Sequence, residues 1–179
     1  MRRPSLLAWA LLALWSAWLH ALQGQWAAAS PWAADLGMVL LVVLAARMPA
    51  GDLVKGGLAV ALGRIAVTID PPAAVLVGLL VPMAVFGALR SVVVIRAGPA
   101  RAVLAGLASA LLAWWLAHVH LVRAGGSPAG LAASLDPGAW RTALSTALVA
   151  LVLGPLFALL PGLALVTRRR AWEVAASSR

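Results

Sequence analysis

Two charged residues of this sequence fall within long apolar runs, where a membrane-spanning segment would place them in hydrocarbon. Asp35 lies near the start of one run and Arg64 near the end of the next. Charges at membrane depth are costly unless paired or hydrated, so both are candidate functional residues. In antiparallel helices their depths differ by about 4.5 Å at 1.5 Å per residue, which an arginine can bridge. We predict an ion pair that either lets the segment carrying Arg64 insert or binds a partner or substrate.

The three histidines could titrate near neutral pH or bind a metal. His20, His118 and His120 map to the same side of the pattern, and three histidines could hold zinc with an open fourth position. Residues two apart on a helix, such as His118 and His120, do not face each other. We therefore interpret the histidines as polar residues at the membrane interface and predict no metal site. Asp70, before Pro71, is interpreted as a solvated turn residue.

A search for catalytic constellations finds nothing specific. The sequence has no HExxH, no Gly-rich phosphate loop, no GxSxG and no paired aspartates on facing segments. A dyad of Ser109 or Ser145 with His118 can be drawn, but serine in membrane helices usually serves packing and hydrogen bonding. There is no cysteine, hence no thiol nucleophile and no thiolate metal site. We predict a protein that is not an enzyme and uses no cofactor.

The composition indicates what kind of elements must position these residues. Hydrophobic residues make up 64% of the chain, charged residues 11%, and the mean hydropathy is +0.99. A water-soluble domain of 179 residues could not cover such a surface with polar groups. The net charge of +9 would be compatible with nucleic-acid binding. Because the basic residues lie between apolar runs, however, they indicate membrane topology, with the lipid bilayer and not nucleic acid as the partner.

Six apolar runs approach the length of about 20 residues that a membrane crossing requires. We predict an all-α polytopic membrane protein, a single domain over residues 1–179 that forms a compact bundle of six transmembrane helices. The predicted helices cover about 5–22, 32–48, 53–70, 72–94, 101–121 and 140–166, and a basic tail follows at 167–179.

The first and third of these segments each need a further argument. A cleavable signal peptide is the alternative for the first, but its apolar core of about 18 residues exceeds the usual 7 to 15, which favours a retained helix. In the third, Arg64 costs about 2.5 to 3.5 kcal/mol, whereas each Leu, Ile or Val contributes about 0.3 to 0.6 kcal/mol of stabilisation. Its insertion alone is therefore near balance, and neighbouring helices must stabilise it.

The basic residues predict the orientation, because short cytoplasmic loops are enriched in Lys and Arg. Arg123 and Arg141 fall on one side of the pattern, and Arg64 falls within a segment. The remaining eleven share the other side, namely Arg2, Arg3, Arg47, Lys55, Arg90, Arg96, Arg101, Arg168, Arg169, Arg170 and Arg179. We predict that this side is the cytoplasm, that it holds both termini, and that the membrane is a bacterial inner membrane.

Two further patterns concern helix packing. Ala102, Gly106 and Ala110 form a stripe of small residues at four-residue spacing, which suits close approach of helices within the fold or between copies. Pro82 and Pro155 each remove an intrahelical hydrogen bond, so we expect bends in the fourth and sixth helices. Bends suit a transporter cavity and simple close packing equally.

Several features together resemble a known family. They are the Pro31 and Asp35 lead into a Leu/Val-rich second segment, Gly56-Gly57 and Gly63 in a third segment ending at Asp70, Leu89-Arg90 at the end of the fourth, and Gly154-Pro155 before the basic tail. With its size and six segments, the chain resembles the rod shape-determining protein MreD family. The resemblance implies a non-enzymatic scaffold that joins MreC and MreB in the complex guiding lateral cell-wall synthesis.

A transport role is the alternative. The membrane-embedded substrate-binding subunits of energy-coupling-factor vitamin transporters are similar in size and also have six helices. For such a subunit, or another small-solute transporter, Trp18, His20, Trp114 and His118 would line an outer pocket. The loop over 123–138 offers few polar groups that would recognise a vitamin, so the scaffold is the first prediction.

Overall fold

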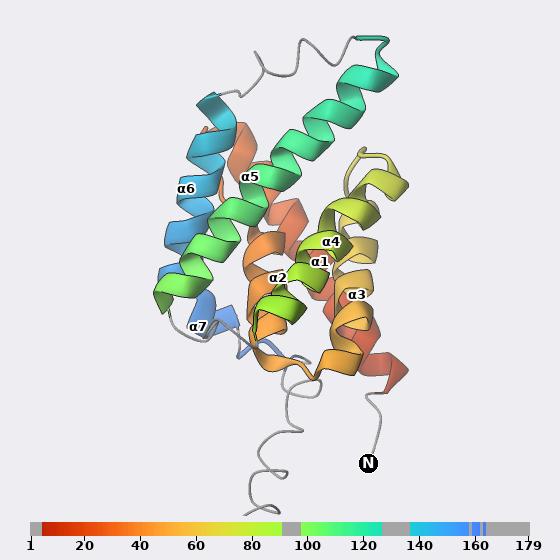
Figure 1. Ribbon diagram of the computed structural model, residues 1–179, viewed down its shortest axis with the longest axis vertical. Coiled ribbons are helices and arrows are strands. Elements are labelled where there is room, and N and C mark those ends of the chain that lie inside the picture. The colour runs from red at the N-terminus through yellow and green to blue at the C-terminus, as the bar shows by residue number, and fades with distance from the viewer. Residues whose placement is uncertain (1–4, 91–97, 127–136, 158, 162, 164–179) are drawn as a thin grey trace, which may run out of the picture.

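The computed structural model of the protein describes residues 5–90, 98–126, 137–157, 159–161 and 163. Throughout this part the regular elements are helices (Figure 1). In chain order they are α1 (Leu6–Ala29), α2 (Leu36–Arg47), the short 3-10 helix η1 (Ala50–Asp52), α3 (Leu53–Ile65), α4 (Pro72–Leu89), α5 (Gly98–Arg123), α6 (Pro137–Val152) and α7 (Gly154–Phe157). Three of them, α1, α4 and α5, are long and apolar enough to cross a membrane. The protein is therefore an all-α membrane protein.

The helices alternate in direction along the bundle. In Figure 1, α1, α3 and α5 run upward from the lower end, and α2, α4 and α6 run back down. Arg47 ends α2, Lys55 lies in the first turn of α3, and Arg90 follows α4, so all three lie at the lower end. We call this end the basic end. Arg123 and Arg141 lie toward the opposite end, as the last residue of α5 and the fifth residue of α6.

Helix α2 is the centre of the fold. It packs against α1, α3, α4, α5, α6 and α7, and all its residues from Gly37 to Ala45 are buried. Its 12 residues rise only about 18 Å at 1.5 Å per residue, which is less than the hydrocarbon thickness of about 30 Å. A helix enclosed by protein does not need to match that thickness, because its ends meet other helices instead of lipid.

Several helix boundaries differ from the predicted ones for local reasons. The second helix starts at Leu36 and not at 32, because Asp35 is its N-cap and accepts a hydrogen bond from the Met38 N–H at 2.9 Å. The third ends at Ile65 and not at 70, because Val67, Thr68 and Ile69 follow it and β-branched residues lower helix propensity. The first helix extends to Ala29 and α5 spans 98–123, both longer than predicted. The fourth ends at Leu89, and the predicted residues 91–94 lie outside the described part.

The predicted sixth helix, 140–166, is broken in two. α6 ends at Val152 and α7 begins at Gly154, directly before Pro155, as the expected bend there requires. Residues 164–166 of the predicted helix and the tail at 167–179 lie outside the described residues. At the other predicted bend, Pro82 lies inside α4, which continues through it without interruption.

Arg101 compensates for the break between α6 and α7. Pro155 has no N–H to donate to the Leu151 carbonyl four residues earlier, and the Arg101 Nη2 lies 3.4 Å from that oxygen. The Arg101 Nε donates to the Ala150 carbonyl at 2.8 Å, and the guanidinium packs on Gly154. Arg101 is buried, so it serves helix packing as well as the charge of the basic end.

We expect Arg101→Met to lower the free energy of unfolding by about 2 kcal/mol, because a buried and a part-buried carbonyl lose a charged donor while an aliphatic stem is kept. Thermal unfolding in detergent, followed by circular dichroism, measures the effect. Arg123→Met, at an exposed position of the same helix, is the matched control and should unfold with the wild type. Equal unfolding midpoints for the two variants would contradict this role of Arg101.

The small-residue stripe of α5 packs within the fold. A Cβ atom on Gly106 would lie 3.0 Å from the Ala143 carbonyl oxygen and 3.1 Å from the Ala147 Cβ, so α6 occupies this face. Ala102 is buried as well. Ala110, at the far end of the stripe, lines a groove described below. Of the two uses that the sequence allowed, the structure places Gly106 in internal packing.

Candidate functional site

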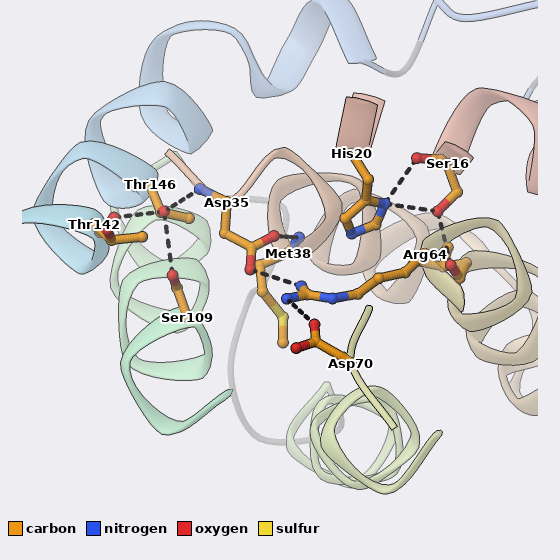
Figure 2. A network of polar contacts seen from close by, with 10 residues as sticks. Ser16, His20, Asp35, Met38, Arg64, Asp70, Ser109, Thr142 and Thr146 are labelled. Atoms are coloured by element: carbon orange, nitrogen blue, oxygen red, sulfur yellow. Dashed lines mark hydrogen bonds and ion pairs between the residues drawn. The ribbon is translucent and has the colours of Figure 1, made fainter. Parts of the chain in front are cut away.

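The two charged residues singled out in the sequence lie next to each other inside the bundle. The Arg64 Nη1 is 3.3 Å from the Asp35 Oδ2, and the two side chains are 9% and 6% exposed (Figure 2). Asp35 also caps α2, which the sequence did not indicate, because its Oδ1 accepts a hydrogen bond from the Met38 N–H. The pair therefore joins the end of α3 to the start of α2.

Asp70 is a third member of this charged group and not the solvated turn residue we expected. Its Oδ2 lies 3.4 Å from the Arg64 Nη2, and its Oδ1 lies 3.0 Å from the His120 Nε2. The carboxyl is 16% exposed, whereas the His120 ring is half exposed. The guanidinium of Arg64 thus contacts two carboxylates. One belongs to Asp35 at the N-cap of α2, and the other belongs to Asp70 in the turn between α3 and α4.

Hydroxyl groups extend the group to α5 and α6. The Asp35 N–H donates to the Thr146 Oγ1 at 2.8 Å, and the Thr146 hydroxyl in turn lies 2.6 Å from the Thr142 carbonyl oxygen. The Ser109 Oγ is 3.3 Å from the Thr146 Oγ1 (Figure 2). Ser145 donates to the Thr142 carbonyl at 3.0 Å. Both serines therefore serve hydrogen bonding between and within helices, which leaves the dyad with His118 without support.

His20 is buried inside the bundle, whereas the sequence predicted a polar residue at the membrane interface. Its Nδ1 lies 2.7 Å from the Ser16 carbonyl oxygen, which only accepts, so this nitrogen carries the proton. The other edge of the ring lies against Gly37, where any Cβ atom would overlap it. The Ser16 hydroxyl donates to the Val60 carbonyl at 2.7 Å. The packing of His20 against α2 thus depends on a glycine whose role a single sequence does not reveal.

The remaining two histidines lie apart from His20. The His118 ring stacks on Trp114 with centroids 5.9 Å apart, and His120 contacts Asp70. Trp115, beside His118, donates its indole N–H to the Ala74 carbonyl at 2.9 Å. Among the described residues no group of three His, Asp or Glu side chains is placed to hold a metal ion.

Two grooves on the described part of the bundle surface differ in their lining. The larger, the α1–α5–α6 groove, has a volume of about 720 Å³ and lies toward the end opposite the basic end. Its lining is Ala27, Ser30, Pro31, Ala33, Leu107, Ala110, Leu111, Ala113, Trp114, Ala117, Gly138, Ala139, Trp140 and Thr142. Of the four residues expected to line a vitamin pocket, it contains only Trp114. The smaller, the α1–α3 groove, has a volume of about 490 Å³.

The chemistry open to this arrangement is narrow. Within the described chain, most polar groups of this network bond to one another and to backbone carbonyls, and they link five helices. The buried Arg64 Nε, His20 Nε2 and Thr68 Oγ1 have no hydrogen-bond partner among the described residues. Ser16 lies beside a possible base, since its Oγ is 3.3 Å from the His20 Nδ1. That nitrogen already carries a proton and the hydroxyl donates to Val60, so His20 does not activate Ser16 as a nucleophile. The network is therefore suited to fixing the relative positions of helices.

Comparison with protein-family models, with curated proteins and with solved structures finds no match for this chain.

Proposed function

We propose that this protein is a non-enzymatic scaffold of the cell-shape and cell-wall elongation machinery in a bacterial inner membrane, similar to proteins of the MreD family. One observation carries the proposal. The interior charge of Arg64 is paired with those of Asp35 and Asp70, while the larger open groove is mostly apolar. An interior held in this way gives a rigid body, and an apolar groove gives that body a surface for partners within the membrane.

The proposed topology has six spans with both termini in the cytoplasm. The alternating helix directions and the position of Arg47, Lys55 and Arg90 at one end support it, because cytoplasmic loops are enriched in such residues. α2 and α3 are short for a crossing, but α2 is enclosed by protein, and the charge of Arg64 near the end of α3 is paired. α1 belongs to the folded bundle, since it supplies Ser16 and His20 to the core.

The lining of the α1–α5–α6 groove favours a partner helix over a polar solute. Small residues dominate it, and small residues let a second helix backbone approach closely in a membrane. Its polar groups are few, the hydroxyls of Ser30 and Thr142 and the indole N–H groups of Trp114 and Trp140. A vitamin pocket would need several polar groups that converge on the ligand. On this proposal an MreC-like membrane protein uses the groove, and an MreB-like cytoskeletal protein binds at the basic end.

Depletion of the protein in its host tests the proposed role. We expect cells to become wider and rounder and new peptidoglycan to be inserted at dispersed sites, which microscopy with a fluorescent cell-wall label records. Normal cell shape, together with loss of uptake of one vitamin, would contradict the scaffold and support a transport subunit.

A complementation experiment tests the groove itself. In depleted cells we expect Ala110→Trp to fail to restore cell width, because the indole fills the groove where a partner helix would lie. Val103→Trp is the matched control, since Val103 lies on the same helix, is 59% exposed and does not line the groove. Cell width after induction of each variant at equal protein level is the measurement. Restoration by both variants would place the partner surface elsewhere on the bundle.

A further inference from the structure

The α1–α3 groove differs from the larger groove in carrying a cation at one end. Its α1 wall is Leu6, Trp9, Ala10 and Ala13, and its α3 wall is Lys55, Leu58, Ala59 and Leu62. Seven of these eight residues are apolar, and Lys55 is the charged one. Lys55 lies in the first turn of α3, so the ammonium is at the basic end. The groove is therefore amphipathic along its length.

The groove is closed toward the middle of the bundle. Directly beyond Ala13 and Leu62, α1 and α3 approach so closely that a Cβ atom on Gly63 would lie 2.6 Å from the Ser16 Cβ and 2.7 Å from the Ala17 backbone nitrogen. From Leu6 to Ala13 the groove is about 10 Å long at 1.5 Å per residue, within one leaflet of a hydrocarbon core about 30 Å thick. A helix that crosses the membrane could not continue along it, whereas part of an acyl chain from one leaflet can lie along it.

The basic end of the groove attracts anions. The Lys55 side chain is 55% exposed, and its ion pair with Asp52 is long, at 3.4 Å. An ammonium has three donors, so Lys55 can contact Asp52 and a phosphate together. Both α1 and α3 begin at this end, and the start of a helix carries partial positive charge. In the sequence, Arg2 and Arg3 lie four and three residues before Leu6, the first residue of α1.

We propose that the α1–α3 groove is a binding site for an anionic phospholipid of the cytoplasmic leaflet. One acyl chain lies along Trp9, Ala10 and Leu58, and the phosphate contacts the Lys55 ammonium. This inference uses the orientation proposed above but not the scaffold role. Normal cell shape after depletion would overturn the scaffold role but would not affect the lipid site. Absence of lipid selectivity in the wild type would overturn the lipid site but would not affect the scaffold role.

Native mass spectrometry of the full chain, released from detergent with added lipid, tests the site. We expect at least tenfold preference for one phosphatidylglycerol over phosphatidylcholine in the wild type. Lys55→Gln should reduce that preference at least fivefold, and Lys55→Arg should keep it. Arg47→Gln, which removes another exposed cation of the same end, is the matched control and should behave as the wild type. Equal loss in Lys55→Gln and Arg47→Gln would show diffuse attraction and overturn the site.

A second measurement needs no variant, because Lys55 is the single lysine of the chain. Acetylation of its amine, followed by peptide mass spectrometry, should slow at least threefold in vesicles of phosphatidylcholine with phosphatidylglycerol relative to phosphatidylcholine alone. Inorganic phosphate added to the latter should protect much less, since it lacks the chain that the groove holds. Protection by phosphate equal to that by the lipid, or no protection by the lipid, would overturn the proposal.

Discussion

Replacing Arg64 with methionine is expected to lower the free energy of unfolding by about 3 to 5 kcal/mol, the usual cost of removing one partner from a buried ion pair. The Asp35 and Asp70 carboxylates lie 3.3 and 3.4 Å from this guanidinium. Without it, the buried Asp35 carboxylate loses its cation and stays near the partly exposed Asp70 carboxylate. Methionine keeps an apolar stem in place of the arginine methylenes, so the effect reports mainly the lost charge and its hydrogen bonds. Thermal unfolding in detergent, followed by circular dichroism, gives the measurement.

The partner residue supplies the control for this prediction. Asp35→Asn keeps a good N-cap for α2 while it removes the charge, and Arg64 still contacts Asp70. We expect this variant to lose less stability than Arg64→Met. The double variant should recover part of the loss, with a coupling energy above about 1 kcal/mol, as residues in direct contact show. Strictly additive losses, or wild-type unfolding of Arg64→Met, would contradict a structural role of the ion pair.

The sequence predicted the centre of this network but not its extent. Asp35 and Arg64 stood out because charges are rare at membrane depth, and antiparallel helices would bring them level. Asp70 was missed because Arg64 reaches it across a non-helical turn, and spacing along a helix gives no information about such a turn. The burial of His20 was not predicted, because it depends on the space that Gly37, a residue of another helix, leaves for the ring. Contacts of this kind are decided by tertiary packing.

Helix ends were hard to predict from the sequence for the same reason. Apolar length identified the regions of α1, α4 and α5 well, since most of each apolar stretch is not buried against the rest of the protein. α2 is shorter than its apolar run because Asp35 caps it and other helices enclose it. Arg101 looked like an ordinary cytoplasmic cation, yet it bonds to carbonyls on α6. Its partners lie 49 and 50 residues away, beyond the reach of any local pattern.

Gly63→Ala is expected to lower the free energy of unfolding by about 3 kcal/mol, the upper part of the usual range for overpacking. The added methyl group would overlap the Ala13 carbonyl and the Ala17 nitrogen of α1, which are backbone atoms and cannot rotate away. α1 and α3 must then separate, which also lengthens the 2.7 Å hydrogen bond from Ser16 to the Val60 carbonyl. Denaturation in detergent, compared with the wild type at equal protein concentration, measures the loss.

Gly24→Ala is the matched control, because Gly24 lies on α1, one of the same two packed helices, in open surroundings. Beyond the local backbone of α1, no described atom lies within 4 Å of the place where its methyl group would be added. There alanine should stabilise the helix by about 0.5 to 1 kcal/mol, since glycine loses more backbone freedom on folding. The two substitutions are chemically identical and should have opposite signs. If Gly63→Ala instead stabilised the protein, the close approach of α1 and α3 would be wrong, and the closed end that limits the α1–α3 groove to one leaflet would be lost with it.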